Sequence, residues 1–214
     1  LKTPLTVISG FIETLEDMFP NNGKEHQNIF KMMGDQAYNM SKLIDDLLLL
    51  SNVESSLFQN RSEKLTIDTI INKIKKDILI LNVKNHKIKY QVSKNLNIYG
   101  SKKEIKSAFL NLITNAIRYT NNNGSIFISW GLINGLPIFE VRDTGSGIEQ
   151  KHINRITERF YRVDVDRSRD TGGTGLGLSI VKNIIKQHDG ELKITSEVGE
   201  GSSFKLIFNK ESVI

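Results

Sequence analysis

The 214-residue sequence predicts an α+β protein in which a helical hairpin precedes a two-layer sandwich of helices and strands. Two observations support this prediction. An apolar repeat with alternating three- and four-residue spacings occupies residues 1–54, and beyond residue 63 helical and strand periodicities follow one another. Residues 55–63 lose both periods and become polar, so we expect them to link a hairpin over 1–54 to a second domain over 64–210.

The amino-terminal repeat is typical of helices that pack along a seam. Its period of about 3.5 residues, interrupted at 19–23, predicts two antiparallel helices. One hairpin leaves part of its apolar stripe uncovered, so we expect two chains to form a four-helix bundle, which makes a homodimer. The alternative is that the hairpin packs on its own second domain. The seam consists of Leu5, Ile8, Ile12, Leu15 and Phe19, followed by Ile29, Met33, Gln36, Met40, Leu43, Leu47 and Leu50.

The second domain mixes both periodicities. We expect strands at 64–67, 88–92, 96–99, 125–130 and 137–142, and a closing hairpin of 191–196 and 202–208 that turns at Gly199 and Gly201. One helix should start at a cap formed by Asp68, a second should follow the cap Ser101 as far as residue 119, and a third should cover 175–188, with Gly190 as its stop.

The composition narrows the function. The net charge of +5 comes from basic residues that are spread along the chain, which argues against nucleic acid as a partner. The absence of cysteine excludes disulfides, thiolate zinc sites and a cysteine nucleophile. No apolar run approaches the roughly 20 residues that a membrane helix needs.

Two asparagines suggest a polar ligand. Asn111 and Asn115 lie four residues apart in an otherwise apolar helix, so they share one face. Their amide oxygens suit a hard cation such as Mg²⁺, which shares phosphate oxygens. Arg118, about one turn further on, could meet a phosphate. A purely structural asparagine pair is an equal alternative.

A carboxylate at a strand end suggests the recognition of a base. Asp143 follows the strand 137–142 and precedes Gly145 and Gly147, which allow the backbone to approach a flat ligand. An ionised aspartate only accepts hydrogen bonds, so it matches the exocyclic amine of adenine. The alternative is an ordinary Asp-Gly turn.

A glycine-rich segment suggests phosphate binding. The run from Gly172 to Gly177 leads directly into a helix, whose exposed amides form an anion site. It matches neither a Walker loop nor a dinucleotide fingerprint. Upstream, Phe160 and Tyr161 precede the polar stretch 163–170, which is typical of a lid anchored by two aromatics. The alternative is that these aromatics fill a core.

Together these motifs, in this order and with the final Gly199 and Gly201, resemble the sensor histidine kinases and their GHKL-type ATP-binding domain. The opening Leu1-Lys2-Thr3-Pro4-Leu5-Thr6 resembles the end of the family's phosphoacceptor motif, His-Glu-Leu-Lys/Arg-Thr-Pro-Leu-Thr. The resemblance covers essentially the whole chain. The stretch 157–164, with Arg167-Ser168-Arg169, is similar to the branch of the family that serves the phosphate regulon.

The resemblance implies roles for individual residues. Asn115 would bind Mg²⁺ with support from Asn111, and Asp143 would bind the adenine amine in a pocket shaped by Gly145 and Gly147. Arg162 would help to bring the γ-phosphate to the acceptor, and Thr3 matches a residue that orients water for dephosphorylation. The other implied contacts to the nucleotide are Arg118, Tyr119, Phe160, Tyr161, Gly173, Thr174, Gly175, Leu176 and Gly177.

The implied activity is that of a protein histidine kinase, which passes the γ-phosphoryl of Mg-ATP to a histidine and then to a response-regulator receiver domain. The acceptor histidine would precede Leu1, and none of His26, His86, His152 and His188 has its context. We therefore expect that these 214 residues do not autophosphorylate. The resemblance also implies the cytoplasmic portion of a bacterial protein that is anchored in the inner membrane through a region ahead of Leu1.

Two other functions compete with this one. The chain could be an adapter or phosphatase module that binds nucleotide and a regulator without transferring phosphate. It could also be an ATPase of the chaperone, mismatch-repair or gyrase kind. The seam and the Thr3-Pro4 pair argue against the ATPase, since those proteins have no such hairpin.

Overall fold

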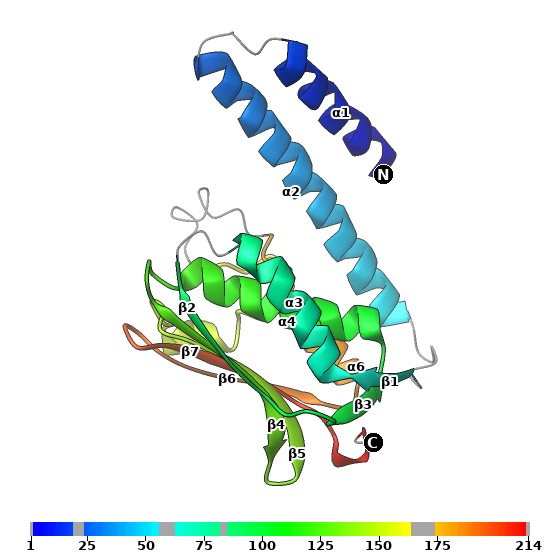
Figure 1. The fold of residues 1–214 in the computed structure, drawn as a ribbon, viewed down its shortest axis with the longest axis vertical. Helices are drawn as coiled ribbons and strands as arrows, with labels where there is room; N and C mark the ends of the chain where they lie inside the picture. The colour runs from blue at the N-terminus through cyan, green and yellow to red at the C-terminus, as the bar shows by residue number, and fades with distance from the viewer. Residues whose placement is uncertain (1, 19–23, 56–62, 82–84, 164–173, 213–214) are drawn as a thin grey trace.

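The computed structural model describes residues 2–18, 24–55, 63–81, 85–163 and 174–212. Helices α1 (Lys2–Met18) and α2 (Lys24–Ser55) form the expected hairpin, and α2 runs on until it lies against the second domain (Figure 1). None of the described helices is long and apolar enough to span a lipid bilayer.

The hairpin buries only part of its seam. Ile12 and Ala37 are buried where α1 packs on α2. Five of the apolar seam residues remain about half exposed in the single chain; they are Ile8, Ile29, Met33, Met40 and Leu47. Toward its carboxyl end, α2 packs on the second domain, where Leu50 is only 3% exposed and belongs to the common core. The contact with the chain's own second domain therefore covers one end of the stripe and leaves the rest open.

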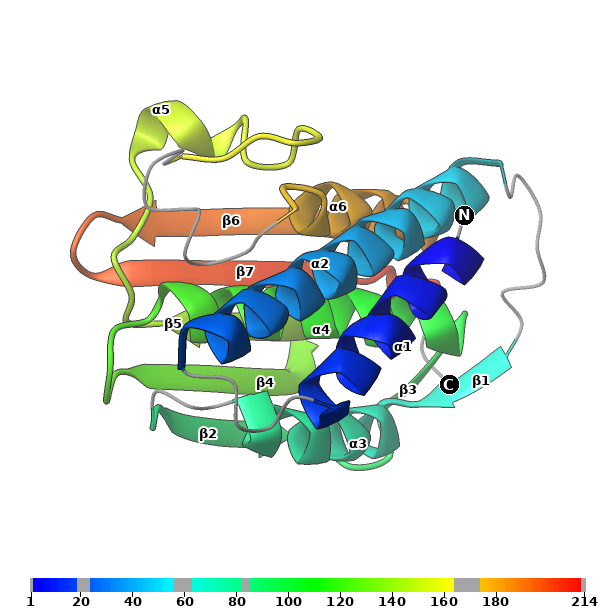
Figure 2. The same ribbon diagram turned by 90° about the horizontal axis from the view of Figure 1, so that it is seen from above.

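The second domain is a two-layer sandwich, as expected. Its five-stranded sheet has the order β2-β4-β5-β7-β6; β2 runs parallel to β4 and the other neighbours are antiparallel. Three helices, α3, α4 and α6, cover one face (Figure 2). The sheet strands are β2 (Lys87–Val92), β4 (Ser125–Ile133), β5 (Leu136–Asp143), β6 (Glu191–Glu197) and β7 (Gly201–Ile207).

The remaining elements frame this sandwich. Strands β1 (Glu63–Thr66) and β3 (Asn97–Gly100) form a separate antiparallel pair. The helices are α3 (Ile67–Leu81), α4 (Lys102–Tyr119), the short α5 (Gln150–Ile153) and α6 (Gly177–Gln187), followed by a 3₁₀ turn at Lys210–Ser212.

Close aromatic packing fixes α4 to the sheet. The ring of Phe109 stacks on that of Phe139 in β5, with centroids 3.7 Å apart and an angle of 8° between the planes. Trp130 in β4 meets Phe208 edge-on and donates a hydrogen bond to the carbonyl of Leu96. Because the buried face of α4 is held in this way, the position of its polar face relative to the end of β5 is also fixed.

The structure corrects several expected boundaries. Ile67 starts α3 instead of ending a strand, so Asp68 lies in the first helical turn and is not the cap. Ser101 is the N-cap of α4, but its hydroxyl makes no capping hydrogen bond. Gly175 precedes α6 because its φ of +71° is incompatible with a helix, which begins at Gly177. Gly190 ends α6 as predicted and donates its N–H to the carbonyl of Ile185.

Two further differences concern elements that the sequence pattern did not reveal. The hairpin of β4 and β5 is longer than expected, because Asn134 and Gly135 both adopt positive φ and form a tight turn. Helix α5 has only four residues, which is too short for a periodic signal.

Candidate functional site

The polar face of α4 meets the start of α6. The Asn111 amide nitrogen donates to the carbonyl of Ser107 at 3.0 Å, and its oxygen lies beside Gly177. A Cβ at position 177 would come within 2.7 Å of that oxygen, so a side chain there would force the amide of Asn111 to move. Asn115 lies one turn further along the same face and is half-buried. Asn111 therefore lies beside the first residue of α6, and Asn115 shares its face of α4.

Asp143 is a buried carboxylate at the end of β5. It is 5% exposed, and one of its oxygens accepts a hydrogen bond of 2.8 Å from the N–H of Gly145. Burial raises the pKa of Asp143 above its ordinary value, while hydrogen bonds from the backbone amides of Gly145 and Ser202 oppose that shift. This carboxylate is thus held by neutral donors rather than by a cation.

The loop after Asp143 is fixed by backbone hydrogen bonds on both sides. The N–H of Ser146 donates to the carbonyl of Tyr119 at the end of α4, and the carbonyl of Ser146 accepts from Gly199 in the β6–β7 turn. A Cβ at Gly145 would lie 2.5 Å from the carbonyl oxygen of Tyr119, and one at Gly147, where φ is +70°, would lie 2.0 Å from that of Glu197. Both positions therefore require glycine, because the protein's own backbone lies against them; the predicted approach of a flat ligand stays a prediction.

The turn at Gly199 and Gly201 also packs against the loop after Asp143. Gly201 has φ +115°, and a Cβ there would lie 2.1 Å from the carbonyl oxygen of Asp143. The hydroxyl of Ser196 accepts the N–H of Ile148 at 2.8 Å. Sequence reasoning identified Gly199 and Gly201 as a turn but missed Ser196, because a serine in an alternating strand carries no signal for a contact 48 residues away.

The aromatic pair and the glycine-rich segment lie side by side. The N–H of Phe160 donates to the carbonyl of Gly175 at 3.0 Å, and both residues have positive φ. The phenol of Tyr161 hydrogen-bonds to Nδ1 of His152 at 2.6 Å, and the Arg155 guanidinium lies 4.2 Å from the centre of its ring. Phe160 is 60% exposed, so it does not fill a core, whereas Tyr161 packs against the core. His152 and Arg155 were not predicted to take part.

Of the other predicted site residues, the structure describes some and leaves two wholly or in part outside the described residues. Arg118 and the half-exposed Tyr119 form the end of α4, next to the Asp143 loop. Arg162 follows Tyr161 and is partly buried. Gly173 and the side chain of Thr3 lie outside the described residues.

The segment before α6 also contacts the hairpin. The hydroxyl of Thr174 donates to a carboxylate oxygen of Asp46 in α2 at 3.2 Å, and it accepts the N–H of Leu176 at 3.3 Å. Leu176 itself is fully buried and caps α6. Thr174 therefore connects the glycine-rich segment to α2 of the helical hairpin.

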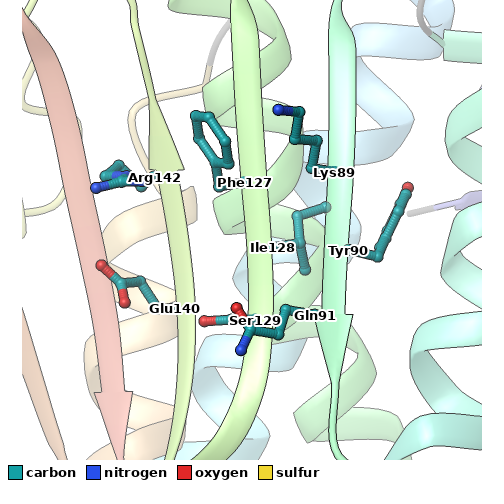
Figure 3. Close-up of a pocket in the computed structure, with 8 residues that line it drawn as sticks. All are labelled: Lys89, Tyr90, Gln91, Phe127, Ile128, Ser129, Glu140 and Arg142. Carbon is teal, nitrogen blue, oxygen red and sulfur yellow. The ribbon is translucent and has the colours of Figure 1, made fainter.

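A separate hollow of about 390 Å³ lies over β2, β4 and β5 (Figure 3). The ring of Phe127 lies between two cations, since the guanidinium carbon of Arg142 is 4.7 Å and the ammonium of Lys89 5.6 Å from its centre. Glu140 accepts a hydrogen bond from Ser203 and pairs with Lys205. Phe127, Lys89 and Arg142 alternate along their strands with the helix-facing residues, so they point away from α4, and this hollow is separate from the Asn111–Asp143 site.

Comparisons with known proteins agree with this geometry. Residues 100–212 match the family described as "Histidine kinase-, DNA gyrase B-, and HSP90-like ATPase", and residues 1–56 match "His Kinase A (phospho-acceptor) domain". The two domains follow one another as in the sensor histidine kinases, and the chain belongs to that family. It is not an ATPase of the gyrase kind, since the phospho-acceptor domain precedes the ATPase domain.

More narrowly, the chain is similar to the phosphate regulon sensor protein PhoR. It is 40% identical to PhoR of Pseudomonas aeruginosa over 97% of this chain and 47% of that protein. It is 39% identical to PhoR of Haemophilus influenzae over 100% of this chain and 50% of that protein. The chain thus spans about half the length of these curated relatives.

Solved structures support the fold. Full-length ShkA in complex with AMPPNP aligns with a TM-score of 0.78 at 22% identity, over 97% of this chain and 43% of that one. The Acinetobacter baumannii histidine kinase AdeS aligns with a TM-score of 0.71 at 24% identity, over 98% of this chain and 96% of that one. Both the helical arm and the sandwich therefore occur together in known histidine kinases.

Proposed function

We propose that this chain binds Mg-ATP and supplies its γ-phosphoryl group to a histidine, from which it passes to an aspartate of a response-regulator receiver domain. The observation that carries the proposal is the buried Asp143 carboxylate, which two backbone amides hold at the end of β5, in a loop that hydrogen-bonds to the end of α4, the helix that carries Asn111 beside the start of α6. Since the relatives are phosphate regulon sensors, we infer that the signal concerns phosphate supply.

Adenine would bind at Asp143. Its ionised carboxylate only accepts hydrogen bonds, so it matches the exocyclic amine of adenine and opposes the carbonyl of guanine at that place. Gly145 and Gly201 have no room for a side chain, because the backbone of Tyr119 and of Asp143 packs against them, and this packing holds the end of β5 in place. Tyr119 at the end of α4 borders the same loop and would contact the base.

The phosphates would bind between α4 and the start of α6. The amides of Gly175–Gly177 and the helix amino terminus favour anions, and Arg118 adds a cation at the end of the polar face of α4. The donors available there are amide oxygens, and no group of three or more histidine, aspartate or glutamate side chains suited to a metal occurs among the described residues. This set fits Mg²⁺, which would bind to Asn115 and to phosphate oxygens and would neutralise part of their charge.

In the transfer step, the chain would position the triphosphate rather than react with it. An in-line transfer of a phosphoryl group depends on orientation and charge neutralisation, for which Asn111, Arg118 and Arg162 are placed. His86 and His188 are buried and His152 is hydrogen-bonded to Tyr161, so we do not assign any of them as the acceptor. We expect the 214 residues alone not to label themselves.

The exposed seam would be the surface for a second copy. The large apolar side chains along α1 and α2 that stay exposed here would become buried in a four-helix bundle of two hairpins. The receiver domain would dock on this bundle. We further infer that the chain lies on the cytoplasmic side of a bacterial inner membrane, to which a region ahead of Leu1 would anchor it.

The replacement Asp143→Asn tests the adenine assignment. The asparagine oxygen can still accept the N–H of Gly145, but its NH₂ group then faces the adenine amine, so two donors oppose one another. Because a hydrogen bond to a charged group contributes about 1.5–3 kcal/mol, we expect Mg-ATP affinity to fall by about 10- to 150-fold in a calorimetric titration.

The matched control is Asp189→Asn, which removes an exposed aspartate in the turn after α6. Asparagine tolerates the positive φ of that turn, and the control should bind Mg-ATP like the wild type. Unchanged affinity in folded Asp143→Asn would refute the adenine assignment, and a wild type that binds GTP as well as ATP would do the same.

A further inference from the structure

The contact between Asp46 and Thr174 joins the helical arm to the proposed phosphate site. Leu43, Leu49 and Leu50 of α2 pack against the core of the second domain, and α2 contacts α6 (Figure 2). Asp46 lies three residues after Leu43 and four before Leu50, so it shares the face of α2 that meets the domain. A carboxylate is therefore brought into the middle of an otherwise apolar contact.

The carboxylate occupies a place that suits a phosphate oxygen. Its Oδ2 accepts the hydroxyl proton of Thr174, one residue before Gly175 and three before the start of α6. Phosphate oxygens are acceptors too, so they and Asp46 require the same donor. A negative charge here also opposes the approach of a triphosphate, since charges this close interact even in a solvated interface.

Burial destabilises the ionised carboxylate of Asp46 at this position. Burial raises the pKa of its carboxyl above the ordinary value, whereas the hydrogen bond from Thr174 and the charge of Lys42 oppose the shift. The hydrogen bond between a hydroxyl and a half-buried ionised carboxylate is weak, so a better-matched anion can take the place of the carboxylate.

We infer that Asp46 determines the nucleotide affinity of this site: its carboxylate competes with the nucleotide phosphates for Thr174, so that binding of Mg-ATP separates this part of α2 from the glycine-rich segment. The inference rests on the proposed function, because it places the phosphates at the start of α6. It makes Asp46 a positioning residue that couples the helical arm to nucleotide binding, without contact to the adenine.

The test is a comparison of ligands in wild type and Asp46→Asn by calorimetric titration. The asparagine oxygen can still accept from Thr174, but the negative charge is gone. We expect Mg-ATP to bind about three- to tenfold more tightly, with a smaller gain at high salt because the lost repulsion is electrostatic. Adenosine, which has the base but no phosphate, should bind equally to both proteins, and this also shows that the variant is folded.

The matched control is Asp45→Asn, which neutralises the neighbouring and exposed carboxylate of α2. It should change the affinity for Mg-ATP far less than Asp46→Asn. Equal affinities in wild type and Asp46→Asn would overturn the inference, as would an equal effect of the control. A parallel gain for adenosine would also overturn it, because Asp46 would then act only through the docking of α2. If the wild type binds adenosine but not Mg-ATP, or neither, the proposed function fails first.

Discussion

The close approach of the β6–β7 turn to Asp143 gives a sharp test of how the site is built. At Gly201 φ is +115°, and a Cβ would lie 2.1 Å from the carbonyl oxygen of Asp143, well inside the 3.0 Å below which such contacts essentially do not occur. Gly199, two residues earlier, also has positive φ (+86°) but nothing within 4 Å of its Cβ position. The pair therefore separates backbone strain from steric contact.

The expected costs differ accordingly. Gly199→Ala should destabilise the protein by about 1 kcal/mol, the penalty of one residue in a left-handed conformation. Gly201→Ala adds a clash between backbone atoms and should cost about 3–4 kcal/mol in total. For a protein of this size, each kcal/mol lowers the melting temperature by about 2–4 °C, so we expect shifts of about 3 °C and about 10 °C.

Ligand binding provides the second measurement. To relieve the clash in Gly201→Ala, the end of β5 must move, and the carboxylate of Asp143 moves with it. A shift of about 1 Å takes a hydrogen bond out of its favourable range, so Mg-ATP affinity should fall at least about tenfold. Gly199→Ala should keep its affinity within about twofold. If both variants melt at the same temperature and bind Mg-ATP alike, the close packing around Asp143 does not determine the geometry of the site.

Further predictions concern the raised pKa of Asp143 and the exposed seam of the hairpin. Because the pKa of Asp143 is raised in the folded protein, the folded state holds more protons than the unfolded one between the ordinary value of 3.8 and the raised value, so this group's contribution to stability falls as pH rises through that window. Mg-ATP binding needs the ionised form and should weaken as pH falls toward the raised value, a step that titrations of Asp143→Asn should lack. In the helical hairpin, Met33→Glu places a charge on the exposed seam and should convert a dimer into a monomer in analytical ultracentrifugation. The control Leu132→Glu replaces an exposed side chain at the end of β4 and should leave the dimer intact. A wild-type monomer or a dimeric Met33→Glu would contradict the expected bundle.

The sequence predicts the elements well because periodicity is a local property. The alternation of apolar and polar residues in 125–130 and the helical spacing around Phe109 each depend on a few neighbouring residues. The sheet order β2-β4-β5-β7-β6 depends instead on pairing between distant strands, such as β5 with β7, and no local pattern encodes it. The boundary at Gly175 was wrong for a similar reason, because its positive φ results from the contact with Phe160.

In the candidate site, too, residues that are neighbours in the chain could be predicted and contacts between distant residues could not. Asp143, Gly145 and Gly147 could be found because they follow one another in the chain. One of the two backbone amides that hold Asp143 belongs to Ser202 in β7, and this partner could not be found in this way. Asp46 is the clearest case, since an aspartate in an amphipathic helix is normally a solvent-facing residue, and only the docking of α2 on α6 brings it to Thr174.

Asp46 and Asp143 are alike in one respect and opposite in another. Burial raises the pKa of both, and each is held by hydrogen-bond donors of the chain. An adenine amine offers Asp143 one more donor, so the bound base favours the ionised carboxylate. A phosphate would bring negative charge toward Asp46 and compete for the hydroxyl donor Thr174, so the bound phosphate would disfavour the ionised carboxylate at that place. On the proposed assignments the base would stabilise one buried charge and the phosphates would expel the other, so a single ligand would be held at the end of β5 while it loosens the contact between α6 and the helical hairpin.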